Sequence, residues 1–187
     1  MLFWHVGGTV AVIRYAFRDE RMDLRFLALG AVLPDLVDTP IGLLTYRATG
    51  GVRLVGHTLL FSIAVLAVVL TTTRRGRPRK RWMPLAVGVL VHLILDAMWL
   101  DPETLWWPLL GTGFSPAGAA SAGAYVADVL GDWRVWALEA IGLVYLVVLG
   151  RRAGLGAPAA RRRLVSTGTV AAPIGLATRP GRDGTGG

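Results

Sequence analysis

Apolar stretches of near-membrane length alternate with short charged or glycine-bearing connections along the first 150 residues. A helix needs about 20 apolar residues to cross a bilayer. Most of the stretches approach this length, although the first and the last are short. The pattern therefore predicts an all-α fold, a polytopic membrane helical bundle with about five membrane segments. The apolar segments are residues 1–17, 24–44, 54–73, 82–100 and 135–150.

Basic residues gather in three of the connections, residues 18–25, 74–81 and 151–163. Cytoplasmic loops of membrane proteins carry an excess of Lys and Arg. We therefore expect a multi-pass protein of a bacterial-type cytoplasmic (inner) membrane, with its N-terminus outside and its C-terminus inside. Residues 1–150 would form the membrane-embedded helical domain. Residues 151–187 are rich in Gly, Ala, Pro and Arg without periodicity, and predict a disordered basic cytoplasmic tail.

Composition supports this assignment and narrows the chemistry. Charged residues are 17% of the chain and hydrophobic residues 53%, whereas soluble domains average about 25% charged residues. The net charge of +8 is explained by membrane topology and lipid headgroups, so no specific nucleic-acid partner is predicted. The chain has no cysteine, which excludes disulfides and thiolate metal sites. A metal would be held by His and carboxylate groups.

Ionisable residues within the apolar segments are the candidate functional residues, because such residues are costly in a membrane and usually serve a site. The stretch GVLVHLILDAMWL carries His92 and Asp96 four residues apart, on one helix face. Asp35 and Asp38 also share a face, next to Pro34, which predicts a kinked or broken helix. A rise of 1.5 Å per residue places the ionisable groups in one band, roughly 13–24 Å from the inner end. The complete set is His5, Asp35, Asp38, His57, His92 and Asp96.

Imidazole and carboxylate groups together suit zinc and, as a second choice, manganese. We expect His5, Asp35, His57, His92 and Asp96 to be metal ligands. Asp38 would be a ligand or the general base that orients water. Thr58 and Ser62, on one helix face, would support the ligands. Two other interpretations stay open: a membrane protein that conducts ions or protons, and a non-catalytic scaffold whose polar residues hold helices together.

The order of five short motifs, HVGG, LPDLVD, GHTLLFS, HLILD and WWPLLG, resembles the YdjM-like family over roughly residues 1–110. Members of that family are described as inner-membrane-associated metal-dependent hydrolases, and also as LexA-binding. The family pattern matches the six ionisable residues named above. Its third motif commonly has His-Ser, where this chain has His57 and Thr58.

The family is itself considered distantly similar to zinc-dependent phospholipase C and the S1/P1 nucleases. This likeness implies a membrane-bound, metal-dependent hydrolase of a phosphoester in a lipid or lipid-linked substrate. Those enzymes have a later HxxxE helix, but no His follows His92 here. The resemblance therefore implies one or two metal ions and not three.

Overall fold

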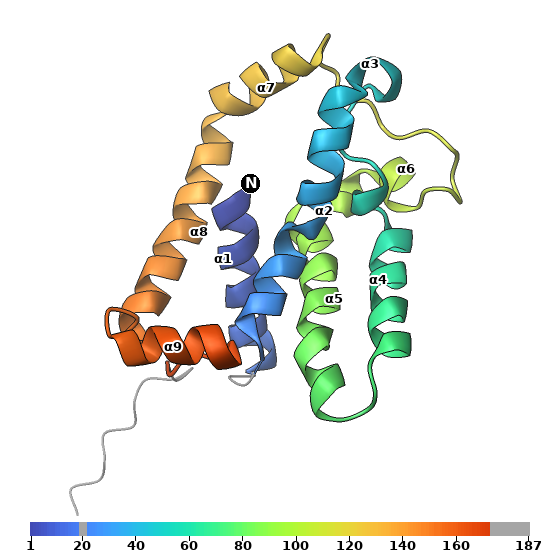
Figure 1. Ribbon diagram of the computed structural model, residues 1–187. Coiled ribbons are helices and arrows are strands. Elements are labelled where there is room, and N and C mark those ends of the chain that lie inside the picture. Colours follow the sequence, from blue (N-terminus) through green and yellow to red (C-terminus); the bar gives the residue numbers. More distant parts are fainter. Residues whose placement is uncertain (19–21, 173–187) are drawn as a thin grey trace, which may run out of the picture.

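The computed structural model describes residues 1–18 and 22–172, and every regular element in these residues is helical. The predicted all-α class is thereby confirmed. Short turns of other helix types occupy Ile13–Phe17, Val55–His57 (η2) and Met98–Leu100. The α-helices, labelled in Figure 1, are α1 (Leu2–Val12), α2 (Leu24–Leu44), α3 (Tyr46–Thr49), α4 (Leu59–Thr72), α5 (Arg77–Leu95), α6 (Pro102–Leu105), α7 (Ala122–Gly131), α8 (Trp133–Arg152) and α9 (Pro158–Thr167).

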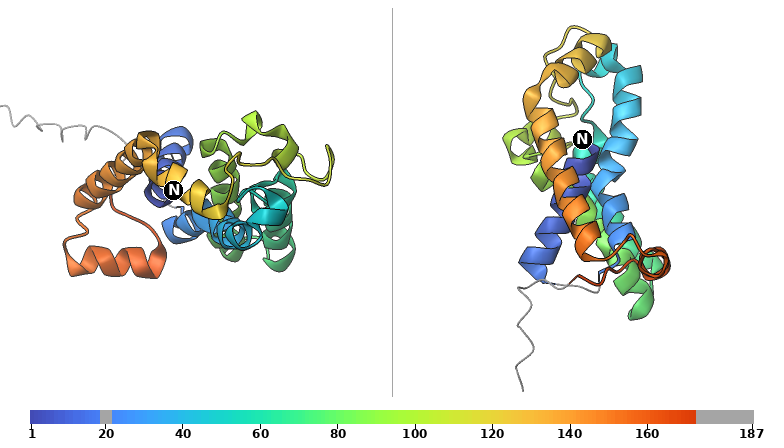
Figure 2. Two further views of the ribbon diagram at one scale, coloured as in Figure 1. Left: turned by 90° about the horizontal axis from the view of Figure 1, so that it is seen from above. Right: turned by 90° about the vertical axis from the view of Figure 1, so that its left-hand side faces the viewer.

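Five helices form the bundle and pack in the order α8, α1, α2, α5 and α4, each against the next. Figures 1 and 2 show α2 running the full height of the bundle, while α1 begins near mid-height. Helix α2 is continuous, with Pro34 and Pro40 inside it, so the predicted break at Pro34 is absent. The C-terminal end of α5 and the N-terminal end of α1 both meet α2 near its middle, where Asp35 lies.

The crossing of α2 and α5 depends on two glycines. A Cβ atom on Gly30 would lie 2.1 Å from the carbonyl oxygen of Leu85, and one on Gly88 would lie 2.5 Å from the carbonyl oxygen of Leu27. Small residues allow the backbones of membrane helices to approach closely. Gly7 of α1 and Gly142 of α8 form a similar crossing. These contacts fix the spacing of the helices that carry the ionisable residues.

We expect Gly88→Val to destabilise the protein strongly, because its side chain would collide with backbone atoms that cannot rotate away. Overpacking in a core typically costs about 1–3 kcal/mol, and occasionally more. The midpoint of denaturant unfolding in detergent would measure this loss. Gly113→Val is the matched control, since open space surrounds a Cβ atom there. Equal midpoints for the two variants would contradict the role of the close crossing.

The prediction of about five membrane segments is not borne out. Among the described residues, only α2 and α8 are both long and apolar enough to cross a membrane. Helix α4 has 14 residues, since the start of the predicted segment forms η2 and the connection to α4. Helix α5 begins with the basic run from Arg77 to Arg81, and α1 has only 11 residues. The apolar pattern predicted too many membrane segments, because the fold places some of these apolar residues in turns and short helices.

Large apolar side chains remain exposed on the outward faces of the long helices. Ile141 and Val144 of α8 and Ile63 and Val68 of α4 are more than half exposed. Soluble proteins rarely expose continuous apolar faces of this kind. These faces fit contact with lipid.

Part of the predicted disordered tail, residues 151–187, is ordered in the structure. Helix α9 begins with Pro158, a favourable first residue, and ends before Gly168, which adopts a left-handed conformation (φ 73°). The backbone N–H of Leu24 donates to the carbonyl oxygen of Gly168 at 2.8 Å, joining α9 to the start of α2. The rest of the predicted tail, residues 173–187, lies outside the described residues.

The start of α2 is closed by Asp23, whose side chain accepts the backbone N–H of Arg25. Burial raises the pKa of the Asp23 carboxyl, but hydrogen bonds from the side chain and backbone of Arg25 outweigh this effect and lower the pKa below its usual value. The carboxylate also ion-pairs with the Arg25 guanidinium at 2.6 Å. Asp23 is therefore charged at neutral pH and stabilises the end of the bundle where α9 docks.

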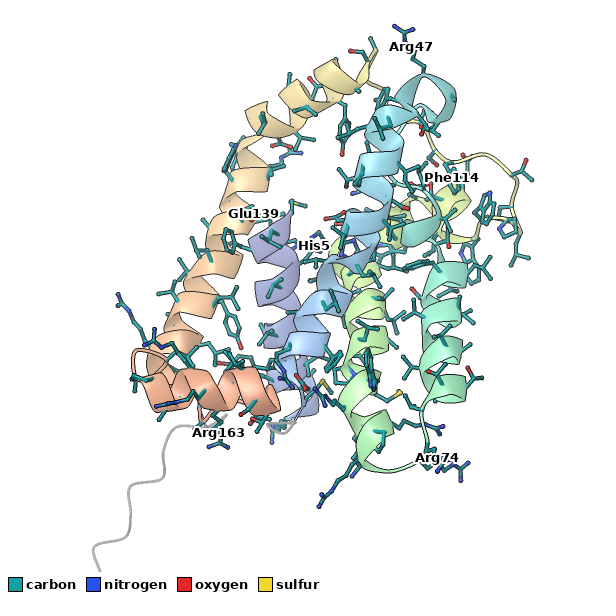
Figure 3. The ribbon with its side chains drawn as sticks, in the orientation of Figure 1. His5, Arg47, Arg74, Phe114, Glu139 and Arg163 are labelled. Atoms are coloured by element: carbon teal, nitrogen blue, oxygen red, sulfur yellow. The ribbon has the colours of Figure 1, made fainter. Side chains whose placement is uncertain are left out.

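Basic side chains are concentrated at this same end. Figure 3 shows Arg74 and Arg163 at the lower end of the molecule and Arg47 at the upper end. The connection between α4 and α5, with Arg74 and Arg75, and helix α9, with Arg161, Arg162 and Arg163, both lie at the lower end. This asymmetry is what the positive-inside rule expects of a cytoplasmic side. The orientation in the membrane remains a prediction.

Candidate metal centre

Four candidate ligands come together where α2, α5 and η2 meet. One ligand atom from each of Asp35, His57, His92 and Asp96 lies within 4.8 Å of the other three. Asp35 comes from α2, His57 ends η2, and His92 and Asp96 belong to the last turn and the C-cap of α5. Residues far apart in the sequence thus converge, as the depth estimate predicted.

The spacing of these atoms fits a single cation. His57 Nε2 lies 3.3 Å from His92 Nε2, 3.4 Å from Asp35 Oδ1 and 3.5 Å from Asp96 Oδ2. His92 Nε2 lies 3.8 Å and 3.9 Å from the same two oxygens. Four ligands held about 2.0–2.1 Å from a zinc ion in a tetrahedron are about 3.3–3.4 Å apart. The His57 distances already match this spacing, whereas the His92 distances are about half an ångström longer and the whole set extends to 4.8 Å, so the carboxylates would have to move inward to hold an ion.

The outer nitrogens of the two imidazoles fix their orientation. His92 Nδ1 lies 2.6 Å from the carbonyl oxygen of Ala31, and His57 Nδ1 lies 2.8 Å from Asp38 Oδ2. A carbonyl or carboxylate oxygen can only accept, so each Nδ1 carries a proton and donates. In its neutral form, each ring would direct an Nε2 lone pair into the cluster. Ligand histidines in metalloproteins are usually held in this way.

The cluster therefore joins two nitrogen lone pairs and two carboxylate oxygens with little water around them. His57 and His92 are buried, and Asp96 is 5% exposed. Acceptors in a dry environment repel one another unless a positive charge lies between them. The N-terminal ammonium of Met1, 3.2 Å from Asp35 Oδ2, and the Arg53 guanidinium, 3.4 Å from Asp96 Oδ2, offset the carboxylate charges from outside the cluster. A divalent cation or an additional proton on an imidazole would supply positive charge within it. Two imidazoles and two carboxylates form a donor set that could hold a divalent metal ion.

Asp38 has a different position from the one expected of a ligand. Its carboxylate accepts the backbone N–H groups of Leu54, Gly56 and His57 at 2.7, 2.8 and 3.1 Å, in addition to the His57 ring. The side chain is 1% exposed and neither oxygen belongs to the four-atom cluster. Asp38 therefore holds the turn before α4 and orients His57. The geometry favours this positioning role over the ligand or general-base role that the sequence indicated.

His5 lies at the edge of the cluster. Its Nε2 atom is 2.8 Å from Asp96 Oδ1, the oxygen that faces away from the four-atom set, and its Nδ1 contacts the carbonyl oxygen of Met1. The ring stacks on His92 with centroids 4.0 Å apart. Figure 3 shows His5 pointing from α1 toward α2 and α5. Its Nδ1 also lies 3.6 Å from Asp35 Oδ2, so this predicted ligand contacts three members of the cluster but does not belong to the four-atom set.

Thr58 and Ser62, the predicted supporting residues, serve the start of α4. Thr58 Oγ1 accepts the backbone N–H of Phe61 at 3.0 Å and donates to the carbonyl oxygen of Val55 at 2.7 Å. Ser62 Oγ is buried and has no hydrogen-bond partner within residues 1–18 and 22–172. Thr58 thus stabilises the helix that follows His57, and acts on the centre only through that turn.

Arg53 is the site residue that the sequence reasoning missed. It lies in the connection between α3 and η2, and its guanidinium is 3.4 Å from Asp96 Oδ2. The side chain is 44% exposed. Arginine in a polar connection is usually solvated, so its type gave no signal. Its position four residues before His57 was the available indication.

A cavity of about 330 Å³ opens beside the four ligands. Asp35, 30% exposed, faces it, while His92 lies behind the other ligands. Polar side chains of its lining come from α1, α2, α5 and the connection before His57, and α7 contributes a group of apolar side chains. Its lining residues are Met1, His5, Asp35, Thr39, Leu43, Val52, Arg53, His57, Asp96, Tyr125, Val126, Val129, Leu130 and Val135.

Comparison with protein families agrees with the motif order. The model of the family described as "YdjM inner membrane protein" matches residues 2–162. The chain belongs to the YdjM inner membrane protein family. This YdjM match covers all four clustered residues, Asp38, His5 and the cavity lining except Met1, and it ends halfway along α9. The family name supports an inner-membrane location.

No curated protein and no solved structure matches this YdjM chain. The expected likeness to phospholipase C and the S1/P1 nucleases therefore receives no support from known folds. The chemical interpretation depends on the geometry of the centre itself.

Proposed function

We propose that this protein is a membrane-bound, metal-dependent hydrolase that acts on a phosphoester of a lipid or lipid-linked substrate. Zinc is the first candidate for the cation and manganese the second. The observation that carries the proposal is the convergence of two imidazole nitrogens and two carboxylate oxygens beside a cavity. A bound divalent cation supplies Lewis-acid activation of water and of a phosphoryl oxygen.

The protein's own groups have separable tasks in this scheme. His57, His92, Asp35 and Asp96 hold the cation, and Asp38 keeps the His57 ring in the required orientation. Asp35 is the most exposed of the four and is the carboxylate closest to an incoming substrate. Arg53 offers its guanidinium to the anionic oxygens of a phosphoester. His5 supports Asp96 from the opposite side.

Two features favour hydrolysis over the alternatives. An ion or proton relay needs polar groups that continue toward the basic end, but the helices below the centre pack through apolar side chains, namely Val10, Ile13, Leu27 and Val91. A purely structural cluster has no need for an adjoining cavity with an arginine and an exposed carboxylate. A pocket with convergent polar groups is the usual form of an active site.

The test is hydrolysis of a panel of phosphoesters by protein reconstituted with zinc or manganese. We expect wild-type activity to disappear with a chelator and to return with the metal. Asp35→Asn should lower the rate at least about 100-fold, because a ligand and its charge are altered. Asp128→Asn, on the exposed surface of α7, is the matched control.

Full activity of Asp35→Asn would overturn the assignment of this centre. A metal-loaded wild-type protein that hydrolyses no phosphoester would overturn the substrate class. In that case, exchange of metal across sealed vesicles would favour the ion-conducting alternative.

A further inference from the structure

The cavity beside the metal centre has an anion-binding group at its polar side. A guanidinium carries five N–H donors, and the ion pair with Asp96 uses only part of this capacity. Arg53 lines the cavity and is nearly half exposed there. Planar guanidinium groups bind phosphate oxygens in pairs, which makes Arg a preferred residue for phosphate recognition.

Helix α7 contributes the largest group of apolar side chains to the cavity, together with Tyr125. Val126, Val129 and Leu130 face the cavity, and Leu43 of α2 extends the wall. Helix α7 buries no side chain completely, and it packs chiefly against α8. Figure 1 shows α7 bridging the upper ends of α8 and α2 above the N-terminus of α1. These apolar residues are therefore available to a ligand and are not consumed by the core.

We propose that the cavity binds a single-chain amphiphile by its terminal phosphate group, with Arg53 holding the phosphate and the apolar face of α7 holding the alkyl chain. The proposal rests on the proposed function for the reaction, and it names the substrate class. A volume of about 330 Å³ is near the lower end of the roughly 300–1,000 Å³ usual for ligand sites. It accommodates a phosphate group and part of one chain.

The test uses alkylphosphonates as probes, because their carbon–phosphorus bond resists phosphoester hydrolysis. Binding of inorganic phosphate and of ethyl-, butyl- and hexylphosphonate to zinc-loaded protein in detergent would be measured by calorimetry. The metal content of each sample would be determined in parallel. For wild type we expect affinity to rise by up to about fourfold for each methylene group that reaches α7.

Two variants separate the two parts of the site. Arg53→Ala should weaken every probe about tenfold or more, since a charge-assisted hydrogen bond is lost, and should leave the dependence on chain length unchanged. The double variant Val126→Thr, Val129→Thr keeps the shape of α7 and should flatten the chain-length dependence while phosphate binding is unchanged. Controls are Arg47→Ala at the upper surface and Ala127→Ser, which does not line the cavity.

Unchanged binding in Arg53→Ala would overturn the role of this arginine. A chain-length dependence that survives in the α7 variant would show that the gain comes from detergent partitioning or another surface, and would overturn the role of α7. Loss of zinc from wild type would instead count against the proposed hydrolase, and the parallel metal analysis identifies that case. Tight phosphonate binding without any hydrolysis would leave this proposal intact and overturn only the reaction.

Discussion

Loss of bound metal is the expected result of replacing His92 and Asp96 together with alanine. The double variant removes one imidazole and one carboxylate from a set whose four ligand atoms lie within 4.8 Å of one another. Removal of even a group that only supports a ligand typically costs 10–100-fold in metal affinity, so we expect a loss of at least about 100-fold here. Elemental analysis of detergent-purified protein would show about one ion in wild type and none in the variant.

His5→Ala is the informative companion to this experiment. The sequence predicts His5 as a ligand, whereas the structure places its Nε2 atom against the outer oxygen of Asp96. We expect His5→Ala to retain the metal with reduced affinity. A complete loss, equal to that of the double variant, would support the larger ligand set. If wild type itself contains no metal after growth in metal-replete medium, the scaffold interpretation becomes the better one.

Asp38→Asn should reduce metal affinity about 10–100-fold, the range found for partners that orient metal ligands. The amide offers one acceptor oxygen where the carboxylate offers two, and its NH₂ group would face donors from Leu54, Gly56 or His57. A buried donor left unpaired costs about 1–3 kcal/mol, so the midpoint of unfolding should also fall. Zinc titration and denaturant unfolding in detergent measure the two effects.

The same variant separates the two roles considered for Asp38. A positioning residue predicts weakened zinc binding, with turnover restored when zinc is raised to saturation. A general base predicts normal zinc binding and no turnover at any zinc concentration. Asp132→Asn, which alters an exposed carboxylate that caps α8, is the matched control.

The hydrophobic pattern predicted the bounds of some helices correctly and those of others incorrectly. The apolar run of residues 24–44 coincides with α2, because a long apolar helix satisfies its own backbone. The run of residues 54–73 is helical only from Leu59. Its first residues donate their N–H groups to Asp38, which lies 16–19 positions earlier. No local pattern records such a contact, so the turn that carries His57 could not be anticipated.

The ligands were easier to predict than the groups around them. Ionisable residues within apolar helices are rare enough that residue type and depth selected all four members of the cluster. Residue type could not separate the four clustered residues from Asp38 and His5, because that distinction depends on tertiary contacts. Both oxygens of Asp38 accept bonds from the turn before α4, and His5 meets the outer oxygen of Asp96. Arg53 was missed for a related reason: only the fold shows that its connection returns to Asp96.

The arginine-rich end of the bundle and the cavity lie on opposite sides of the metal centre, since the cavity is enclosed by α7 and the upper half of α2. In the predicted orientation, the basic end faces the cytoplasm and the cavity opens toward the exterior. A cation bound at the proposed site would then enter from outside the cell and not from the cytosol. The external supply of zinc and manganese, and not the intracellular pool, would decide which ion the site carries and when it is filled.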